Sequence, residues 1–206
     1  WCSLGRTDKS VWVDAPGMNP GGWMGEGTNA RGRYPLHFHK IGTDSVLSDP
    51  VQVRGCFMQF SPGWGYVLHS SHGVFEDNVS YHIYGAAYVT EIGDELGAFR
   101  RNISMHTHGR WGNVPKNGNN NHDFGYLGHA FWFQGRNVIC EDNVAAGSAA
   151  DAFIWFHRSQ GVFIPEIPTS HVLEPWGYDK HKPFFLIDDV PIAFAKGLTA
   201  YASRGG

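Results

Sequence analysis

A segment that recurs along the chain constrains the fold more than any other feature of the sequence. The segment VFEDNVSYHIYGAAYVTE at residues 74–91 returns as VICEDNVAAGSAADAFIWF at residues 138–156, and both contain the tetrapeptide EDNV. In each copy an aromatic residue lies ten positions after the asparagine, as Tyr88 does after Asn78. Self-similarity at a period of about 20–50 residues is typical of repeat proteins, in which stacked units share one core.

Weaker copies of the same segment extend the repeat in both directions. One copy has Cys56 in the asparagine position and Tyr66 ten residues later, and another has Asn102 followed, after an insertion, by Phe131. A fifth copy begins at Ile192.

Each repeat contains three short segments with strand-like composition, separated by glycine and small polar residues. No segment has the 3.6-residue apolar period and the caps of an amphipathic helix. Coils of about 22–24 residues with three short strands are typical of a parallel β-helix. The sequence therefore predicts an all-β solenoid.

The predicted solenoid does not fill the whole chain. Residues 1–32 are rich in glycine, proline and asparagine and are expected to form a loop-rich segment, with the β-helix over 33–206. Two loop insertions are expected, at 109–128 and 158–190. Because the last repeat is incomplete, we expect the chain to be part of a longer protein.

Composition excludes several classes of function. A net charge of −3 with 17% charged residues gives no basic surface for nucleic acid. No apolar run reaches the roughly 20 residues that a membrane-spanning helix needs. The cysteines Cys2, Cys56 and Cys140 have neither the number nor the spacing of a disulfide framework or a zinc site, and are expected to be mostly buried thiols.

The repeated asparagines predict a ladder of side-chain amides. Asn78, Asn102 and Asn143 would lie above one another, each amide bonding to the next coil. Asn78 and Asn102 also begin Asn-X-Ser sequons, so glycosylation is the alternative explanation.

One predicted column is polar, whereas its neighbours are apolar or aromatic. The position three residues after the aromatic slot is His69, Glu91 and Gln134 in successive repeats, and the segment RYPLHFH adds His39, with His37 facing the same way. These side chains would suit a divalent metal or general acid–base catalysis. A purely structural hydrogen-bonded ladder is the alternative.

Carboxylates near this column extend the hypothesis. Asp94 and Glu95 follow Glu91 in the segment TEIGDELG and would suit Ca²⁺ or the second carboxylate of a glycosidase, unless they form an ordinary acidic turn. Asp123 is the candidate carboxylate from the first insertion. Arg100 would pair with the acids of this turn or contact an acidic sugar.

Tryptophans Trp64 and Trp111 are candidates for stacking on sugar rings. The remaining histidines share no predicted column and are expected to be surface or loop residues; they are His82, His106, His108, His129 and His171.

The segments RYPLHFH, GYVLHSSHG, YVTEIGDE, HAFWF and AAGSAADAFIWF, in that order, resemble the β-helical region of cell-migration-inducing and cell-surface hyaluronidases, which fibrocystin-like proteins and bacterial homologues share. The resemblance covers about residues 31–157. It implies an extracellular, right-handed parallel β-helix and, for the hyaluronidases, depolymerisation of hyaluronan helped by calcium. By position, His37, His39, His69 and Glu91 match residues of the family's pattern.

Three hypotheses about function remain open at this stage. The first is an extracellular carbohydrate-active β-helix, a glycosidase or polysaccharide lyase, that cleaves an acidic polysaccharide. The second is a non-catalytic module of a surface or matrix protein that binds a polysaccharide or glycoprotein. The third is a metal site that serves stability or redox chemistry. Across the three hypotheses, the expected cofactor is either none or a divalent cation, which would be Ca²⁺ or a histidine-ligated metal.

Overall fold

The computed structural model describes residues 34–43, 49–61, 63–109, 125, 127–157, 165–172 and 181–204. The predicted loop-rich segment 1–32, with Cys2, lies outside these residues, as does most of the first predicted insertion.

The described residues form strands, with short 3-10 turns at Thr169–His171 and Ile187–Asp189. The predicted all-β class is therefore confirmed. The strands are β1 (Leu36–Gly42), β2 (Val51–Arg54), β3 (Phe57–Gln59), β4 (Tyr66–Glu76), β5 (Val79–Tyr84), β6 (Tyr88–Thr90), β7 (Leu96–Arg100), β8 (Ile103–His108), β9 (Phe131–Phe133), β10 (Val138–Glu141), β11 (Val144–Ala146), β12 (Phe153–Trp155), β13 (Glu166–Pro168), β14 (Phe184–Leu186), β15 (Phe194–Lys196) and β16 (Thr199–Tyr201).

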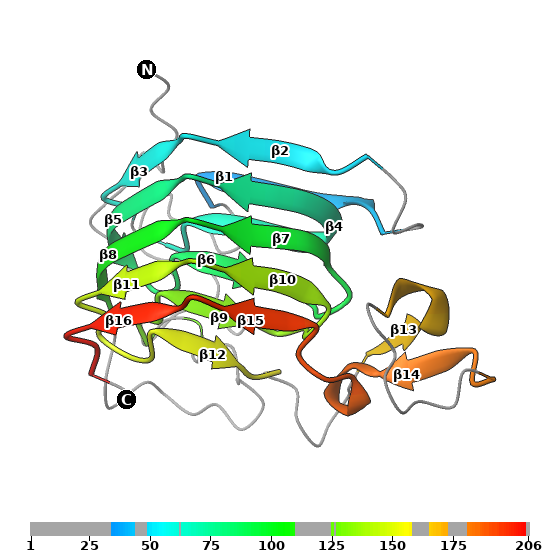
Figure 1. Ribbon diagram of the computed structural model, residues 1–206. Coiled ribbons are helices and arrows are strands. Elements are labelled where there is room, and N and C mark those ends of the chain that lie inside the picture. Colours follow the sequence, from blue (N-terminus) through cyan, green and yellow to red (C-terminus); the bar gives the residue numbers. More distant parts are fainter. Residues whose placement is uncertain are drawn as a thin grey trace, which may run out of the picture.

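The strands stack into parallel layers, as successive arrows in Figure 1 show. We call the layers the first, second and third faces. The first face contains β1, the beginning of β4, β6, β9 and β12. The second face contains β2, the end of β4, β7, β10 and β15. The third face contains β3, β5, β8, β11 and β16.

Strand β4 is long enough to take part in two faces. Its first residues pair with β1 and β6, and its last residues pair with β2 and β7. The chain turns between the two faces at Ser70, whose φ of 43° is in the left-handed region. The site-bearing first face is therefore joined to the second face by a continuous strand.

The core is built from aromatic rings stacked along the column that the repeat predicts. Tyr66 stacks on Tyr88 with ring centroids 4.8 Å apart, Tyr88 on Phe131 at 4.6 Å, and Phe131 on Phe153 at 4.8 Å. These separations match the spacing of neighbouring strands, so the rings follow the backbone ladder without offset. Each coil thus buries its aromatic side chain against the coils on either side.

The predicted asparagine ladder is present and fully buried. The Nδ2 of Asn78 donates to the Oδ1 of Asn102 at 3.0 Å, and the Nδ2 of Asn102 donates to the Oδ1 of Asn143 at 3.0 Å. Cys56 occupies the same position one coil earlier, where its backbone N–H donates to Asn78 Oδ1 at 2.9 Å. Because Asn78 and Asn102 are 0% exposed, their amides are bonded inside the stack rather than presented for glycosylation.

The second predicted insertion contains structure of its own. Strands β13 and β14 pair antiparallel to one side of the stack (Figure 1). A separate apolar cluster lies beneath them, formed by Ile167, Val172, Phe185, Ile187 and Val190.

Replacing Asn102 by alanine is expected to lower the free energy of unfolding by at least about 2 kcal/mol. The substitution leaves the buried carbonyl of Phe75 and the amide groups of Asn78 and Asn143 without the partners that Asn102 supplies. Denaturant-induced unfolding measures this change. The control is Arg101→Gln at the neighbouring exposed position, for which a much smaller loss is expected because exposed ion pairs contribute little to stability. Equal losses in the two variants would contradict the ladder's role.

Candidate functional site

The register of the first face brings the predicted polar column together. His39 of β1 is paired with His69 of β4. The β4–β6 pairing ends at Leu68 and Thr90, so the residues that follow, His69 and Glu91, are neighbours. The β6–β9 pairing ends at Thr90 and Phe133, so Glu91 and Gln134 are neighbours in the same way. Residues that are far apart in sequence thus become neighbours across strands, as the repeat predicts.

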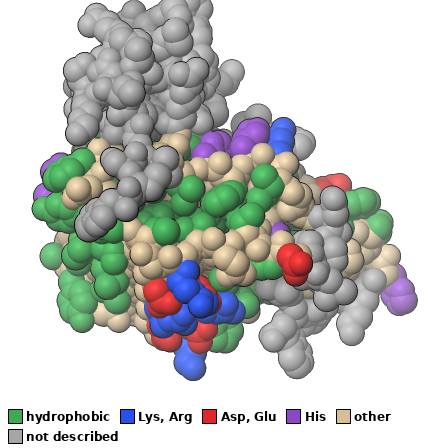
Figure 2. Space-filling model, turned by 90° about the horizontal axis from the view of Figure 1, so that it is seen from above, with side chains coloured by type: hydrophobic (Ala, Val, Ile, Leu, Met, Phe, Trp, Pro, Cys, Tyr) green, Lys and Arg blue, Asp and Glu red, His purple; other side chains and the backbone are tan. Residues whose placement is uncertain are grey.

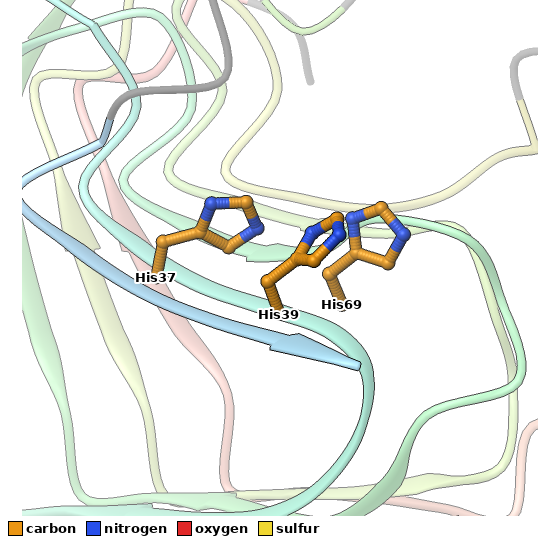
Figure 3. A group of neighbouring side chains, drawn as sticks. All are labelled: His37, His39 and His69. Carbon is orange, nitrogen blue, oxygen red and sulfur yellow. The ribbon is translucent and has the colours of Figure 1, made fainter. Parts of the chain in front are cut away.

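Three histidines and one carboxylate converge along the first half of β1. The Glu91 Oε2 lies 3.0 Å from His69 Nδ1 and 3.3 Å from His37 Nε2. The ligating nitrogens of His37, His39 and His69 all lie within 4.8 Å of one another. Figure 3 shows the rings projecting to the same side of the strands, with those of His39 and His69 next to each other.

The site is largely shielded from water but open at one member. The side chains of His37, His69 and Glu91 are 15%, 12% and 11% exposed, whereas His39 is an exposed residue. The pKa of His39 is lowered, chiefly because its ring is desolvated and secondly because the imidazoles of His69 and His37 lie nearby. This leaves His39 neutral at pH 7, with a lone pair for a proton or a metal.

Glu95 holds the turn that places Glu91. Its carboxylate accepts hydrogen bonds from the backbone N–H groups of Ser70, Glu91, Ile92 and Gly93, at 2.7–3.1 Å. Burial, followed by the charge of Asp94, raises the pKa of Glu95 to about 7. Glu95 is therefore a positioning residue that fixes the backbone on both sides of the His69–Glu91 contact.

Asp94 lies at the edge of the same site. Burial raises the pKa of its carboxyl group, while a hydrogen bond with Ser70 and the nearby His69 act in the opposite direction. Within the described part of the chain, its buried Oδ1 has no hydrogen-bond partner. The structure thus places Asp94 close enough to His69 for electrostatic interaction.

Two residues that the sequence predicts to bind substrate, Trp64 and Gln134, are buried in the structure. Trp64 is 0% exposed and packs between Tyr34 and Trp132, with ring centroids at 4.7 and 5.3 Å, so its indole face is not available to a sugar. Gln134 is 2% exposed, and its side-chain amide donates to the carbonyl of Glu91. Gln134 therefore supports the backbone of the site rather than facing a substrate.

Arg100 belongs to a different cluster. Its guanidinium lies 3.3 Å from Glu76 and 3.3 Å from Glu141 on the second face, rather than beside the acids of the 94–95 turn. The prediction of a pairing with those acids is wrong, because β4 carries Glu76 to the far end of the strand from His69. Figure 2 shows the mixed basic and acidic patch apart from the histidine side chains visible on that side.

Asp123 and Trp111 lie outside the described residues, so their predicted roles stay predictions.

A second histidine cluster was not predicted from the sequence. His82, His106 and His108 place their ligating nitrogens within 4.8 Å of one another on the third face. The signal was present: His82 precedes His106 by the same 24-residue offset that separates Asn78 from Asn102. This cluster lies outside the predicted polar column and forms where β5 and β8 bend.

The donor set of the first cluster determines which ion it fits. Imidazole nitrogens suit zinc, copper or nickel, whereas Ca²⁺ takes six to eight oxygen ligands. The three histidines and one carboxylate therefore do not fit calcium, although they fit a divalent transition metal.

The family model for the CEMIP β-helix matches residues 23–171, and the chain belongs to this family. Neither the curated proteins nor the solved structures gave a match. Among the described residues, no helix is long and apolar enough to cross a membrane.

The charged cluster predicts how stability depends on pH. A hydrogen bond from Arg54, assisted by Arg100, lowers the pKa of Glu76 below its ordinary value of 4.5. The stabilisation is therefore fully present above that ordinary value and is lost as pH falls through the lower pKa of the folded state. Replacing Glu76 by glutamine should destabilise the fold by about 1–3 kcal/mol at pH 7, and by progressively less below pH 4.5.

Denaturant unfolding over a pH series measures this difference. Glu166→Gln, at an exposed position on β13, is the control and should give little change at any pH. A Glu76 effect that stays constant down to the acid limit would contradict the assignment.

Proposed function

We propose that this β-helix is the glycan-processing part of an extracellular protein, and that His37, His39, His69 and Glu91 cleave an acidic polysaccharide such as hyaluronan. The observation that carries the proposal is the contact of Glu91 Oε2 with His69 Nδ1 at 3.0 Å and with His37 at 3.3 Å. Membership of the CEMIP β-helix family supports a carbohydrate-related, extracellular role.

The proposal includes the finer architecture, a right-handed β-helix of about 22–24-residue coils with insertions at 109–128 and 158–190.

The proposed catalytic pair is His69 with Glu91. When His69 Nδ1–H donates to the Glu91 carboxylate, the tautomer is fixed and Nε2 is left to take up or release a proton. The carboxylate also stabilises the imidazolium that forms during the transfer. His39, neutral and exposed, is the proposed second proton-transfer group.

Two reactions use such a pair, and their products differ. In hydrolysis, the protonated group gives its proton to the glycosidic oxygen while the neutral group takes one from the attacking water. In elimination, the base removes the proton next to the uronate carboxylate, the protonated group gives its proton to the leaving oxygen as the bond to that oxygen breaks, and an unsaturated sugar results.

The same residues would hold a transition-metal ion. His37, His39 and His69 are the proposed ligands, and Glu91 is either a fourth ligand or the partner that orients His69. Such an ion, when bound, would polarise an oxygen of the substrate or acidify a bound water.

Replacing Glu91 by glutamine tests the proposal. We expect cleavage of hyaluronan or a related uronic-acid polymer to fall by about 10²- to 10⁴-fold, because the amide cannot stabilise the His69 imidazolium. Product size by gel filtration measures the rate, and ultraviolet absorbance distinguishes an unsaturated product from hydrolysis.

The matched control is Glu166→Gln, the same chemical change at an exposed residue of β13. Circular dichroism and unfolding confirm that both variants keep the fold. Unchanged cleavage by Glu91→Gln would remove Glu91 from the mechanism.

A non-catalytic binding module is the second candidate. The third face exposes several large apolar side chains, a surface suited to binding a partner; they are Phe57, Phe60, Tyr81, Ile103 and Tyr201. Binding of an acidic glycan without any product from the wild-type protein would favour this function over catalysis.

A further inference from the structure

The second histidine cluster arises from the pairing of β5 with β8. Tyr81 is paired with Met105, and Tyr84 with His108. Between these pairs the two strands bend together at His82 and His106, whose φ values are 56° and 57°. The bends bring the three imidazoles to one point on the third face, separate from the cluster on the first face.

The imidazole rings are packed closely. Ring centroids are 4.0 Å apart for His82 and His108, 4.3 Å for His106 and His108, and 5.2 Å for His82 and His106. The ligating nitrogens lie within 4.8 Å of one another, so small rotations about the side-chain bonds would close them on a single ion. His82 and His108 are partly buried, and His106 is exposed.

His108 gives an independent indication of a ligand. Its Nε2 is buried and has no hydrogen-bond partner among the described residues. A buried polar nitrogen without a partner loses the hydrogen bonds that it would make in water. Coordination of a metal ion through its lone pair would satisfy this atom.

The bend at His82 and His106 belongs to every described coil of the third face. Phe60, Gly147 and Ala202 hold the equivalent positions in the other coils, with φ values of 55°, 69° and 50°. The left-handed conformation is therefore a property of the coil, and it brings His82 and His106 next to each other in adjacent coils.

We infer that His82, His106 and His108 form a binding site for a divalent transition-metal ion of the zinc type. Three imidazole ligands favour Zn²⁺, Cu²⁺ or Ni²⁺ over Ca²⁺ and Mg²⁺, which prefer oxygen. Three protein ligands also leave a fourth position for water or another donor. Because the ligands come from β5 and β8, the ion would join two adjacent coils on the third face.

Zinc binding to the protein tests this inference. To separate the two clusters, the test uses the background variant His39→Gln/His69→Gln, which removes two donors from the first cluster. We expect this background to bind about one equivalent of Zn²⁺, measured by equilibrium dialysis and metal analysis, and to gain thermal stability on binding. Adding His106→Gln should abolish both effects, and excess Ca²⁺ or Mg²⁺ should leave them unchanged.

The control is His181→Gln, which replaces an exposed histidine near β14 and should leave zinc binding unchanged. If the background variant does not fold, the same comparison is made in the wild-type protein, where His106→Gln should lower bound zinc by about one equivalent. Zinc binding that His106→Gln does not change, or no binding in a folded background, would overturn the inference. Loss of polysaccharide cleavage plays no part in this test.

Discussion

Backbone hydrogen bonds between parallel strands hold His39 beside His69 and keep Asn78, Asn102 and Asn143 in line. This register determines every other feature, because a shift by a single residue would reverse which side chains face the core. The stacked rings and the amide ladder reinforce it from within the coil. The candidate site consequently depends on contacts that are themselves well buried and remote from solvent.

The site combines a rigid backbone support for Glu91 with one exposed histidine, His39. The Glu95 carboxylate accepts hydrogen bonds from the backbone N–H groups around Glu91, and Gln134 donates to the Glu91 carbonyl, so the backbone that carries the Glu91 side chain is held on both sides. His39, in contrast, is accessible to solvent. Preorganised polar groups in a largely water-excluded environment interact more strongly than the same groups in water. This arrangement supports the proposed role in proton transfer or metal binding.

Much of this organisation could be predicted from the sequence, since a repeat makes equal offsets equivalent to spatial neighbours. The aromatic slot and the asparagine ladder follow from that rule. The His39–His69 alignment also needed Leu36 of the segment RYPLHFH to be placed in the aromatic slot. Burial was harder to predict. Trp64 looks suited to a sugar, but its partners Tyr34 and Trp132 come from other segments, and no pattern in the sequence shows that they cover it. The 24-residue offset aligns His82 with His106. His108 joins them because both strands bend, a backbone detail that side-chain periodicity does not encode.

Successive side chains on the strands of the first face point alternately into the core and to the opposite side, and this determines where the sequence of such a protein can change. Tyr66 and Leu68 point into the core, whereas Val67 packs on the opposite side, in line with His69. The slot that holds His39, His69, Glu91 and Gln134 is therefore separate from the inner aromatic stack, which a change in this slot leaves in place. Point mutations in this slot would alter the chemistry of the surface one coil at a time, so that related chains could share the same scaffold and act on different molecules.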